Sequence, residues 1–185
     1  MPGVTLDEQQ LIRRARDGDL DAYGALVRAH QAAAFRLATV LAGHADAEDI
    51  AQSAFVKAHH GLARFRDGAG FQPWLLRIVA NEARNTVRAR RRRLVRDHRW
   101  ALLPTPGEPD AEARVLARER DEALWRALAR LGSRDREVLG CRYLLELSVE
   151  ETAAALGWPA GTVKSRQNRA LRRLETLLSK EEVLG

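Results

Sequence analysis

The residue types that most often carry out catalysis or bind metals are present, but not at the spacing that such chemistry needs. The single cysteine, Cys141, has no disulfide partner and no metal ligand at a usual spacing, so we predict that it is a packing residue. Residues 157–165 resemble a phosphate-binding loop, but two residues separate Gly161 from Lys164, where that loop has them adjacent. Four histidines lack a carboxylate or thiol at ligand spacing: His44, His59, His60 and His98. We therefore expect no catalytic site, no metal and no cofactor, in a protein that is not an enzyme.

Positive charge is the sequence feature that does indicate a function, because clustered basic residues can bind a polyanion. The 185 residues carry a formal net charge of +6, and arginines are dense over residues 84–99, where four in a row occupy positions 90–93. Arginines neutralise phosphates, and Phe65 and Phe71, at the edges of a predicted loop, could stack on unpaired bases. This stretch is a candidate nucleic-acid surface. The alternative is a solvated, frayed helix end, although adjacent like charges repel unless a polyanion is bound.

A second candidate surface lies in residues 148–178. Ser148 and Glu151 have the spacing of a capping box, Gly157 would end that helix, and Pro159 suits the start of the next. The second helix alternates apolar positions with a basic face. This is the layout of a helix-turn-helix, whose second helix reads the major groove. A helical hairpin with a solvated basic face is the alternative, and the pattern alone does not choose between them.

The elements that must position these surfaces are predicted to be helices. Leu, Ala and Arg dominate the composition, and β-branched and aromatic residues are scarce, which predicts an all-α fold. Helices are expected over residues 6–17, from a cap at Asp19 or Asp21 to about residue 41, and onward from Asp46. A long helix should follow with Pro73 in its first turn and Trp74 in its inward-facing stripe.

A proline-rich stretch divides the chain. Residues 102–111 contain three prolines and no apolar periodicity, so we predict a flexible linker over residues 96–112. It would join two small helical domains, residues 1–95 and 113–185. In the second, we expect helices over residues 110–131 and from a cap at Ser133.

The cellular location follows from what the sequence lacks. We find no signal-peptide pattern and no apolar run long enough to cross a membrane. A lone cysteine is typical of a reducing compartment. We expect a cytoplasmic protein that does not insert into membranes.

Two long segments resemble a known family. DAEDIAQSAFVKAHHGLARF (residues 46–65) and FQPWLLRIVANEARNTVRARRRR (residues 71–93) resemble region 2 of the extracytoplasmic-function (ECF) sigma factors of bacterial RNA polymerase. LGSRDREVLGCRYLLELSVEETAAALGWPAGTVKSRQNRALRRL (residues 131–174) is similar to their region 4. Both segments occur in the family's order, and together they cover most of the chain.

The resemblance implies that the protein binds core RNA polymerase and directs it to promoters, where DNA is opened and transcription begins. The helix over residues 46–59 would dock on the coiled coil of the β′ subunit, and the C-terminal domain would meet the β flap. The implied polymerase-binding residues are Asp46, Glu48, Asp49, Gln52 and Phe55.

Promoter contacts are implied in both domains. A base flipped out of the minus-10 strand would enter a pocket between the loop over residues 65–71 and the helix face with Asn81. The implied minus-10 residues are Phe65, Phe71, Asn81, Arg84 and Arg88. The implied minus-35 residues, on the recognition helix, are Thr162, Lys164, Ser165, Arg166 and Arg169. An anti-sigma factor is a further expected partner.

Two other functions compete with a sigma factor. A stand-alone helix-turn-helix regulator would bind promoters without polymerase, but residues 84–99 and the acidic residues 46–49 would then have no purpose. A sigma-like decoy would occupy an anti-sigma protein without supporting transcription. A decoy has no need of the basic residues that both domains keep.

Overall fold

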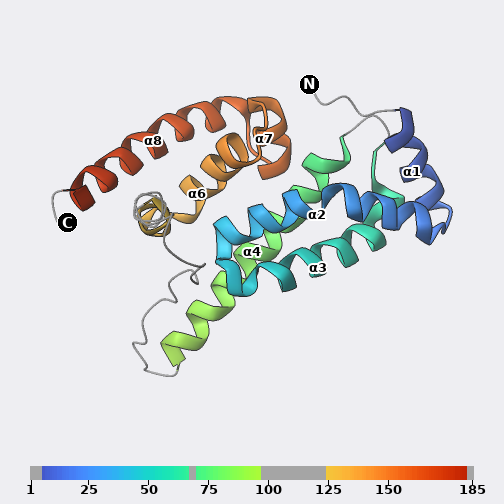
Figure 1. Ribbon diagram of the computed structural model, residues 1–185, viewed down its shortest axis with the longest axis horizontal. Coiled ribbons are helices and arrows are strands. Elements are labelled where there is room, and N and C mark those ends of the chain that lie inside the picture. The colour runs from blue at the N-terminus through green and yellow to red at the C-terminus, as the bar shows by residue number, and fades with distance from the viewer. Residues whose placement is uncertain (1–5, 67–69, 97–123, 183–185) are drawn as a thin grey trace, which may run out of the picture.

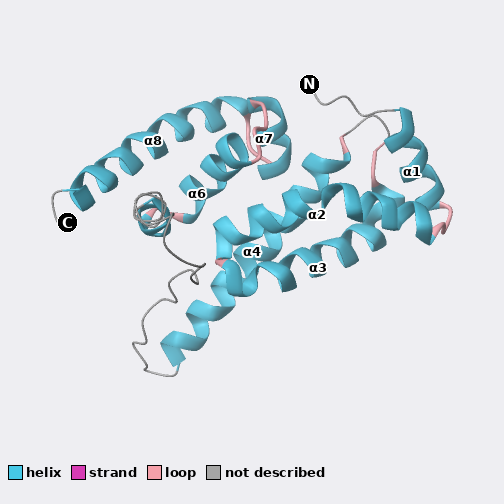
Figure 2. Ribbon diagram, viewed as in Figure 1, coloured by secondary structure: helices cyan, strands magenta, loops and turns pink. Residues whose placement is uncertain are grey.

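The computed structural model describes residues 6–66, 70–96 and 124–182. Helices and their connections make up this part of the chain, and no strand occurs in it, which confirms the all-α prediction (Figure 2). Residues 97–112 of the predicted linker and the first part of the predicted helix over residues 110–131 lie outside the described residues, and residue 96, where the linker was predicted to begin, is the last residue of α4. The helices are α1 (Leu6–Arg16), α2 (Leu20–Ala42), α3 (His44–Gly61), η1 (Leu62–Arg64), α4 (Phe71–Arg96), residues 124–130, α6 (Ser133–Leu139), η2 (Gly140–Leu144), α7 (Val149–Leu156) and α8 (Ala160–Glu182).

The N-terminal half is a bundle of α2, α3 and α4 with α1 packed at one end (Figure 1). Asp19 begins α2, because its side chain accepts a hydrogen bond from the backbone N–H of Ala22 at 3.0 Å. A single residue, Gly43, separates α2 from α3 and adopts a φ of 95°, which favours glycine. The third helix therefore begins at His44, two residues before the predicted start at Asp46.

Helix α4 carries the basic stretch beyond the bundle. Its first turns pack between α2 and α3, where Leu75, Val79 and Ala83 are fully buried. Its C-terminal turns project past the other helices (Figure 1). Trp74 packs against the core as predicted.

The C-terminal half places the helix-turn-helix on a short preceding helix. Ser133 is the first residue of α6, and Gly132 occupies the cap without a side-chain hydrogen bond, so the prediction of a Ser133 cap is wrong. After α6 the chain widens into the π-helix η2. Helix α7 then begins with the predicted capping box between Ser148 and Glu151, and it ends at Gly157, which is left-handed with a φ of 69°.

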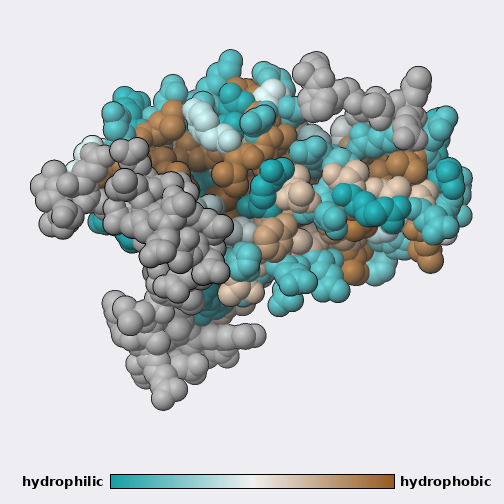
Figure 3. Space-filling view, in the orientation of Figure 1, coloured by the Kyte–Doolittle hydropathy of each residue, from teal (hydrophilic) through white to brown (hydrophobic). Residues whose placement is uncertain are grey.

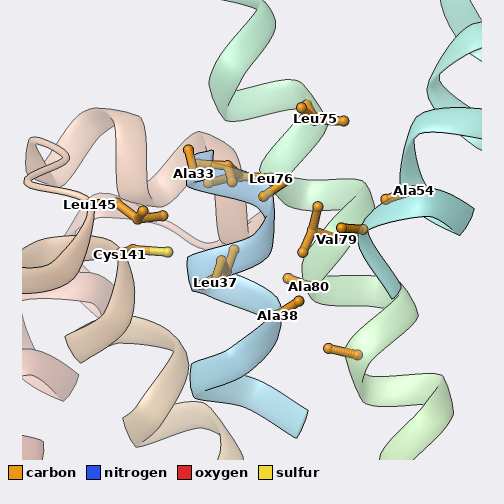
Figure 4. Packing of buried hydrophobic residues seen from close by; sticks show 14 of the residues in the cluster. Ala33, Leu37, Ala38, Ala54, Leu75, Leu76, Val79, Ala80, Cys141 and Leu145 are labelled. Atoms are coloured by element: carbon orange, nitrogen blue, oxygen red, sulfur yellow. The ribbon is translucent and has the colours of Figure 1, made fainter. Parts of the chain in front are cut away.

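The two halves share one hydrophobic core. Residues of α6, η2 and α7 pack against α2 and α4. Cys141 and Leu145 lie beside Ala33 and Leu37 of α2 (Figure 4), and Cys141 is the predicted packing residue, fully buried. On the face shown in Figure 3, hydrophobic residues gather over the C-terminal half. None of the helices among the described residues is long and apolar enough to cross a membrane.

Candidate polymerase and nucleic-acid interfaces

The outer face of α3 carries most of the residues implied in polymerase binding. Glu48, Asp49 and Gln52 are exposed on this face. Asp46 is half-buried, and its Oδ2 lies 3.5 Å from Nη1 of Arg90 on α4. The fifth implied residue, Phe55, is only 8% exposed.

Phe55 therefore belongs to the core beneath the acidic face. Its carbonyl oxygen accepts a 2.5 Å hydrogen bond from the hydroxyl of Tyr23 on α2, which fixes α3 against the bundle. The neighbouring apolar residue, Val56, is 52% exposed. Helical spacing from Asp49 and Gln52 would have identified Val56, because positions three and four apart share a face.

The aromatic residues beside the minus-10 loop form a cluster. The ring centroid of Trp74 lies 5.0 Å from that of Phe65 and 5.6 Å from that of Phe71. Phe65 is 5% exposed and Phe71 is fully buried, so neither ring is open to a base in this arrangement. Residues 67–69 of the loop lie outside the described residues. The two phenylalanines therefore anchor the ends of the loop.

On the next turns of α4, Asn81 is exposed to solvent, and half-buried Arg84 lies at the boundary between the halves. Arg84 donates from Nη1 to Oδ1 of Asn81 at 2.6 Å, and from Nε to Oε1 of Glu137 on α6 at 2.8 Å. The Glu137 side chain is 1% exposed. Burial raises the pKa of this carboxyl above its ordinary value, although the hydrogen bond from Arg84 acts in the opposite direction.

A pocket of about 340 Å³ lies beside this contact. Arg88, which is exposed, lines it together with Arg84 and Glu137, and its other walls include Ser133, Arg134 and Trp158. The implied minus-10 residues Asn81, Arg84 and Arg88 are thus gathered on α4, and one of them is paired with the other half. The contact of Glu137 with Arg84 was not predicted from the sequence, because a single buried carboxylate leaves no hydrophobic or charge periodicity that would identify it.

The polar side chains of the recognition helix α8 lie on two faces, one exposed to solvent and one turned toward α6. Lys164, Ser165 and Arg169 are exposed, and Thr162 is half-buried. Arg166 instead points inward, where its Nη1 lies 3.0 Å from Oδ1 of Asp135 on α6. Its guanidinium carbon lies 5.5 Å from the centre of the Trp158 ring, a cation–π distance.

Asp135 organises this inward side of α8. It is 2% exposed, and its second oxygen, Oδ2, accepts from Nη1 of Arg173 at 2.5 Å. Two exposed residues on the outer side, Asn168 and Arg172, were not predicted as contacts. Their spacing from Ser165, three and seven residues, places them on the same face of α8.

The described residues contain no group of three or more His, Cys, Asp or Glu side chains that could hold a metal ion. Exposed basic side chains of a helix-turn-helix, and arginines on a projecting helix, are surfaces for phosphate and bases. The fold and these surfaces define a helical, two-part DNA-binding protein.

Comparison with known proteins identifies the family. Residues 26–93 match Sigma-70 region 2, and residues 127–175 match Sigma-70, region 4. The RNA polymerase sigma factor NccH of Alcaligenes xylosoxydans xylosoxydans is 35% identical over 181 residues, covering 95% of this chain and 97% of NccH. The ECF RNA polymerase sigma-E factor of Escherichia coli K12 is 32% identical, covering 89% of this chain and 91% of that protein. This chain therefore belongs to the ECF sigma factors of RNA polymerase.

Solved structures agree with this assignment. CnrH, in complex with the cytosolic domain of CnrY, superposes with a TM-score of 0.70 at 27% identity, covering 94% of this chain and 98% of CnrH. The sigma factor RpoE of Bartonella quintana, in complex with the anti-sigma factor NepR, gives a TM-score of 0.72 at 26% identity. That match covers 85% of this chain and 96% of RpoE.

Proposed function

We propose that this protein binds core RNA polymerase, directs it to promoters and opens the DNA for transcription initiation. The observation that carries the proposal is the presence of region 2 and region 4 in one chain, each with an exposed polar surface. Sigma factors act by binding and not by catalysis, so we infer a role without enzymatic activity, performed in the cytoplasm, where the polymerase is.

Core polymerase would bind the outer face of α3. Glu48, Asp49 and Gln52 supply charge and hydrogen bonds, and Val56 supplies an apolar centre on the same face. A coiled coil of the β′ subunit suits this narrow helical surface. In our proposal Phe55 supports the surface from below and does not contact the polymerase.

The β flap would meet the C-terminal half. Tyr143 is 53% exposed, and its hydroxyl accepts a 2.9 Å hydrogen bond from Gln167 Nε2 of α8. Leu171, 37% exposed, lies one helical turn beyond Gln167. Tyr143 and Leu171 thus expose apolar side-chain surface on this half, and exposed apolar surface is typical of protein-binding sites.

Promoter DNA would bind at two places. The minus-10 strand would follow α4, where Asn81 reads a base edge and Arg84 and Arg88 neutralise phosphates. The ring cluster of Phe65, Phe71 and Trp74 would hold the loop that completes the base pocket. The minus-35 duplex would bind the outer face of α8, which includes Lys164, Ser165 and Arg169.

An anti-sigma factor is the regulatory partner that we propose. In the structure of the sigma factor RpoE described above, the anti-sigma factor NepR is bound, and CnrH is bound to the cytosolic domain of CnrY. Their coverage of this chain supports the same kind of partner here. A decoy role would fit the same partner, but the exposed basic face of α8 favours an active sigma factor.

Run-off transcription tests the proposal directly. The purified protein, mixed with core polymerase and promoter fragments from its own genome, should give transcripts with defined start sites. Core polymerase alone is the control. Promoter binding by the protein without any transcript would favour a stand-alone regulator, and binding to neither DNA nor polymerase would favour a decoy.

A further inference from the structure

We propose that helix α1 positions the minus-10 loop from outside the base pocket and so controls how well the protein discriminates the flipped base. Contacts that start from α1 reach both anchors of that loop, Phe65 before it and Phe71 after it. The positioning residues are Arg16, Glu8 and His30, and none of them is proposed to touch DNA. The inference rests on the proposed role of this loop in minus-10 recognition.

Helix α1 is fixed on the bundle by its apolar side. Ile12 and Ala15 are buried in the common core, at 2% and 4% exposure. The helix packs on α2 and on η1, the short helix that leads into the loop, at one end of the bundle (Figure 1). Polar side chains of α1 therefore start from a fixed element, which is the condition for positioning another group precisely.

At the start of the loop, Arg16 holds the backbone. Its Nη2 donates to the carbonyl oxygen of Phe65 at 2.8 Å, across 49 residues of sequence. The backbone N–H of Phe65 donates to the carbonyl oxygen of Leu62 in η1 at 3.0 Å. The carbonyl that Arg16 holds belongs to the peptide unit between Phe65 and Arg66. A charged donor therefore fixes the direction in which the chain enters the loop.

At the end of the loop, a polar pair that starts on α1 supports the ring of Phe71. The ring centroid of His30, on α2, lies 5.1 Å from that of Phe71. Nε2 of His30 lies 3.0 Å from Oε1 of Glu8 on α1, and the two side chains are only 12% and 19% exposed. The carboxylate fixes the rotation of the imidazole. The imidazole is thus held against Phe71 in one orientation.

The two anchors act on one short connection. The ring centroids of Phe65 and Phe71 lie 6.1 Å apart, and residues 66–70 are the five that join them. A shift of either anchor is therefore passed to the residues between. Misplacement of a contact by about 1 Å is enough to remove most of its selectivity. Loss of the α1 contacts should therefore reduce discrimination of the flipped base more than it reduces polymerase binding or overall stability.

Helix α1 supplies both the test variants and a matched control. Arg16→Ala removes the donor to Phe65, and Glu8→Ala releases His30. Arg16→Lys keeps a cation but not the guanidinium, so it should restore part of the effect of Arg16→Ala. The control is Arg14→Ala, which removes an arginine of the same helix whose Nη2 lies 2.7 Å from Oδ2 of Asp19 and which contacts neither anchor through that ion pair.

The experiment measures discrimination by the holoenzyme, formed from core polymerase and each full-length variant. The probe is the non-template minus-10 strand of a promoter mapped by run-off transcription, with each base replaced in turn by an abasic site. Discrimination is the Kd for the abasic strand divided by the Kd for the intact strand, at the position where the wild type gives the largest ratio. Arg16→Ala and Glu8→Ala should each lower this ratio about fivefold or more, and Arg14→Ala should leave it unchanged.

Wild-type ratios in both Arg16→Ala and Glu8→Ala would overturn the role of α1. An equal fall in Arg14→Ala would also overturn it, because the stability of α1 and not its contacts would then control the ratio. Circular dichroism shows whether each variant is folded. If Arg16→Ala is not folded, Arg16→Lys decides in its place, and its ratio should lie below that of the wild type. A wild-type holoenzyme that discriminates at no position would instead contradict the proposed minus-10 function, on which this inference depends.

Discussion

Asp135 and Arg166 lie 31 residues apart on different helices and are joined by a 3.0 Å contact between Oδ1 and Nη1. Because Asp135 is buried and also binds Arg173, it fixes α8 on α6 at two points 7 residues apart (173 − 166). The recognition helix is thus positioned by a carboxylate that it does not itself carry. Arg166 is turned inward as a result, and Arg169 outward.

Removal of the Asp135 charge should destabilise the protein. Asp135→Asn leaves two arginines without their carboxylate, and we expect a loss of about 1–3 kcal/mol in the free energy of unfolding. Urea unfolding measures the change. Glu175→Gln, at an exposed position of α8, is the control and should have little effect.

Arg169 and Arg166 should differ in their effects on minus-35 DNA. Arg169→Ala removes an exposed cation, so duplex affinity should fall. The slope of log affinity against log salt concentration should decrease in magnitude by about one. Arg166→Ala removes the Asp135 contact, so its main effect should be on the urea midpoint. An equal salt dependence of DNA binding in Arg169→Ala and the wild type would show that Arg169 does not contact the DNA.

Asn81 should act in promoter opening and not in polymerase binding. Asn81→Ala should reduce open-complex formation about tenfold, because one base-edge contact is lost. Permanganate footprinting of the holoenzyme measures opening, and gel filtration measures polymerase binding. Asn85→Ala, an exposed amide one turn further along α4, is the control. Loss of polymerase binding in Asn81→Ala would instead assign Asn81 to the fold.

The outer face of α3 should determine affinity for core polymerase. Asp49→Lys and Val56→Asp each change this face without touching the core, and each should weaken polymerase binding about tenfold or more. Fluorescence titration with core polymerase gives the Kd. The melting temperature should stay near that of the wild type, and minus-35 duplex affinity should be unaffected.

Cys141 should make stability depend on alkaline pH. Burial raises the pKa of its thiol to about 12, whereas an unfolded cysteine titrates near about 8.5. The stability that this thiol contributes is complete below about pH 8.5 and is lost as pH rises toward 12, because the unfolded chain loses its proton first. The difference in unfolding free energy between wild type and Cys141→Ala should shrink across this window. A constant difference would contradict the burial of the thiol.

Local signals in the sequence predicted most helices of the fold. Capping residues and glycines act within a few residues, which is why the Ser148 capping box and the end at Gly157 were predicted correctly. The Ser133 cap failed because Gly132 supplies the extended residue one position earlier. Helix α3 begins earlier than predicted because one glycine suffices for the turn.

The sites were less predictable than the helices. Exposed residues such as Glu48 and Arg169 follow from helical periodicity, but the burial of Phe55, Phe65 and Phe71 depends on packing with distant segments. The Glu137–Arg84 contact joins residues 53 apart and leaves no local pattern. A single sequence cannot indicate it, because opposite charges are frequent throughout a chain that is 30% charged.

In the proposed open complex, helix α4 would set a length along the promoter strand. From Asn81 to Arg88 it is one uninterrupted helix, and its rise of about 1.5 Å per residue gives a rigid span of about 10 Å. Nucleotides of one strand are spaced about 3.4 Å apart in the duplex, so this span corresponds to about three of them. The number of bases that these residues could contact at once would therefore be set by the number of residues in a single helix. An insertion of one helical turn between Arg84 and Arg88 would lengthen that contact by about two nucleotides.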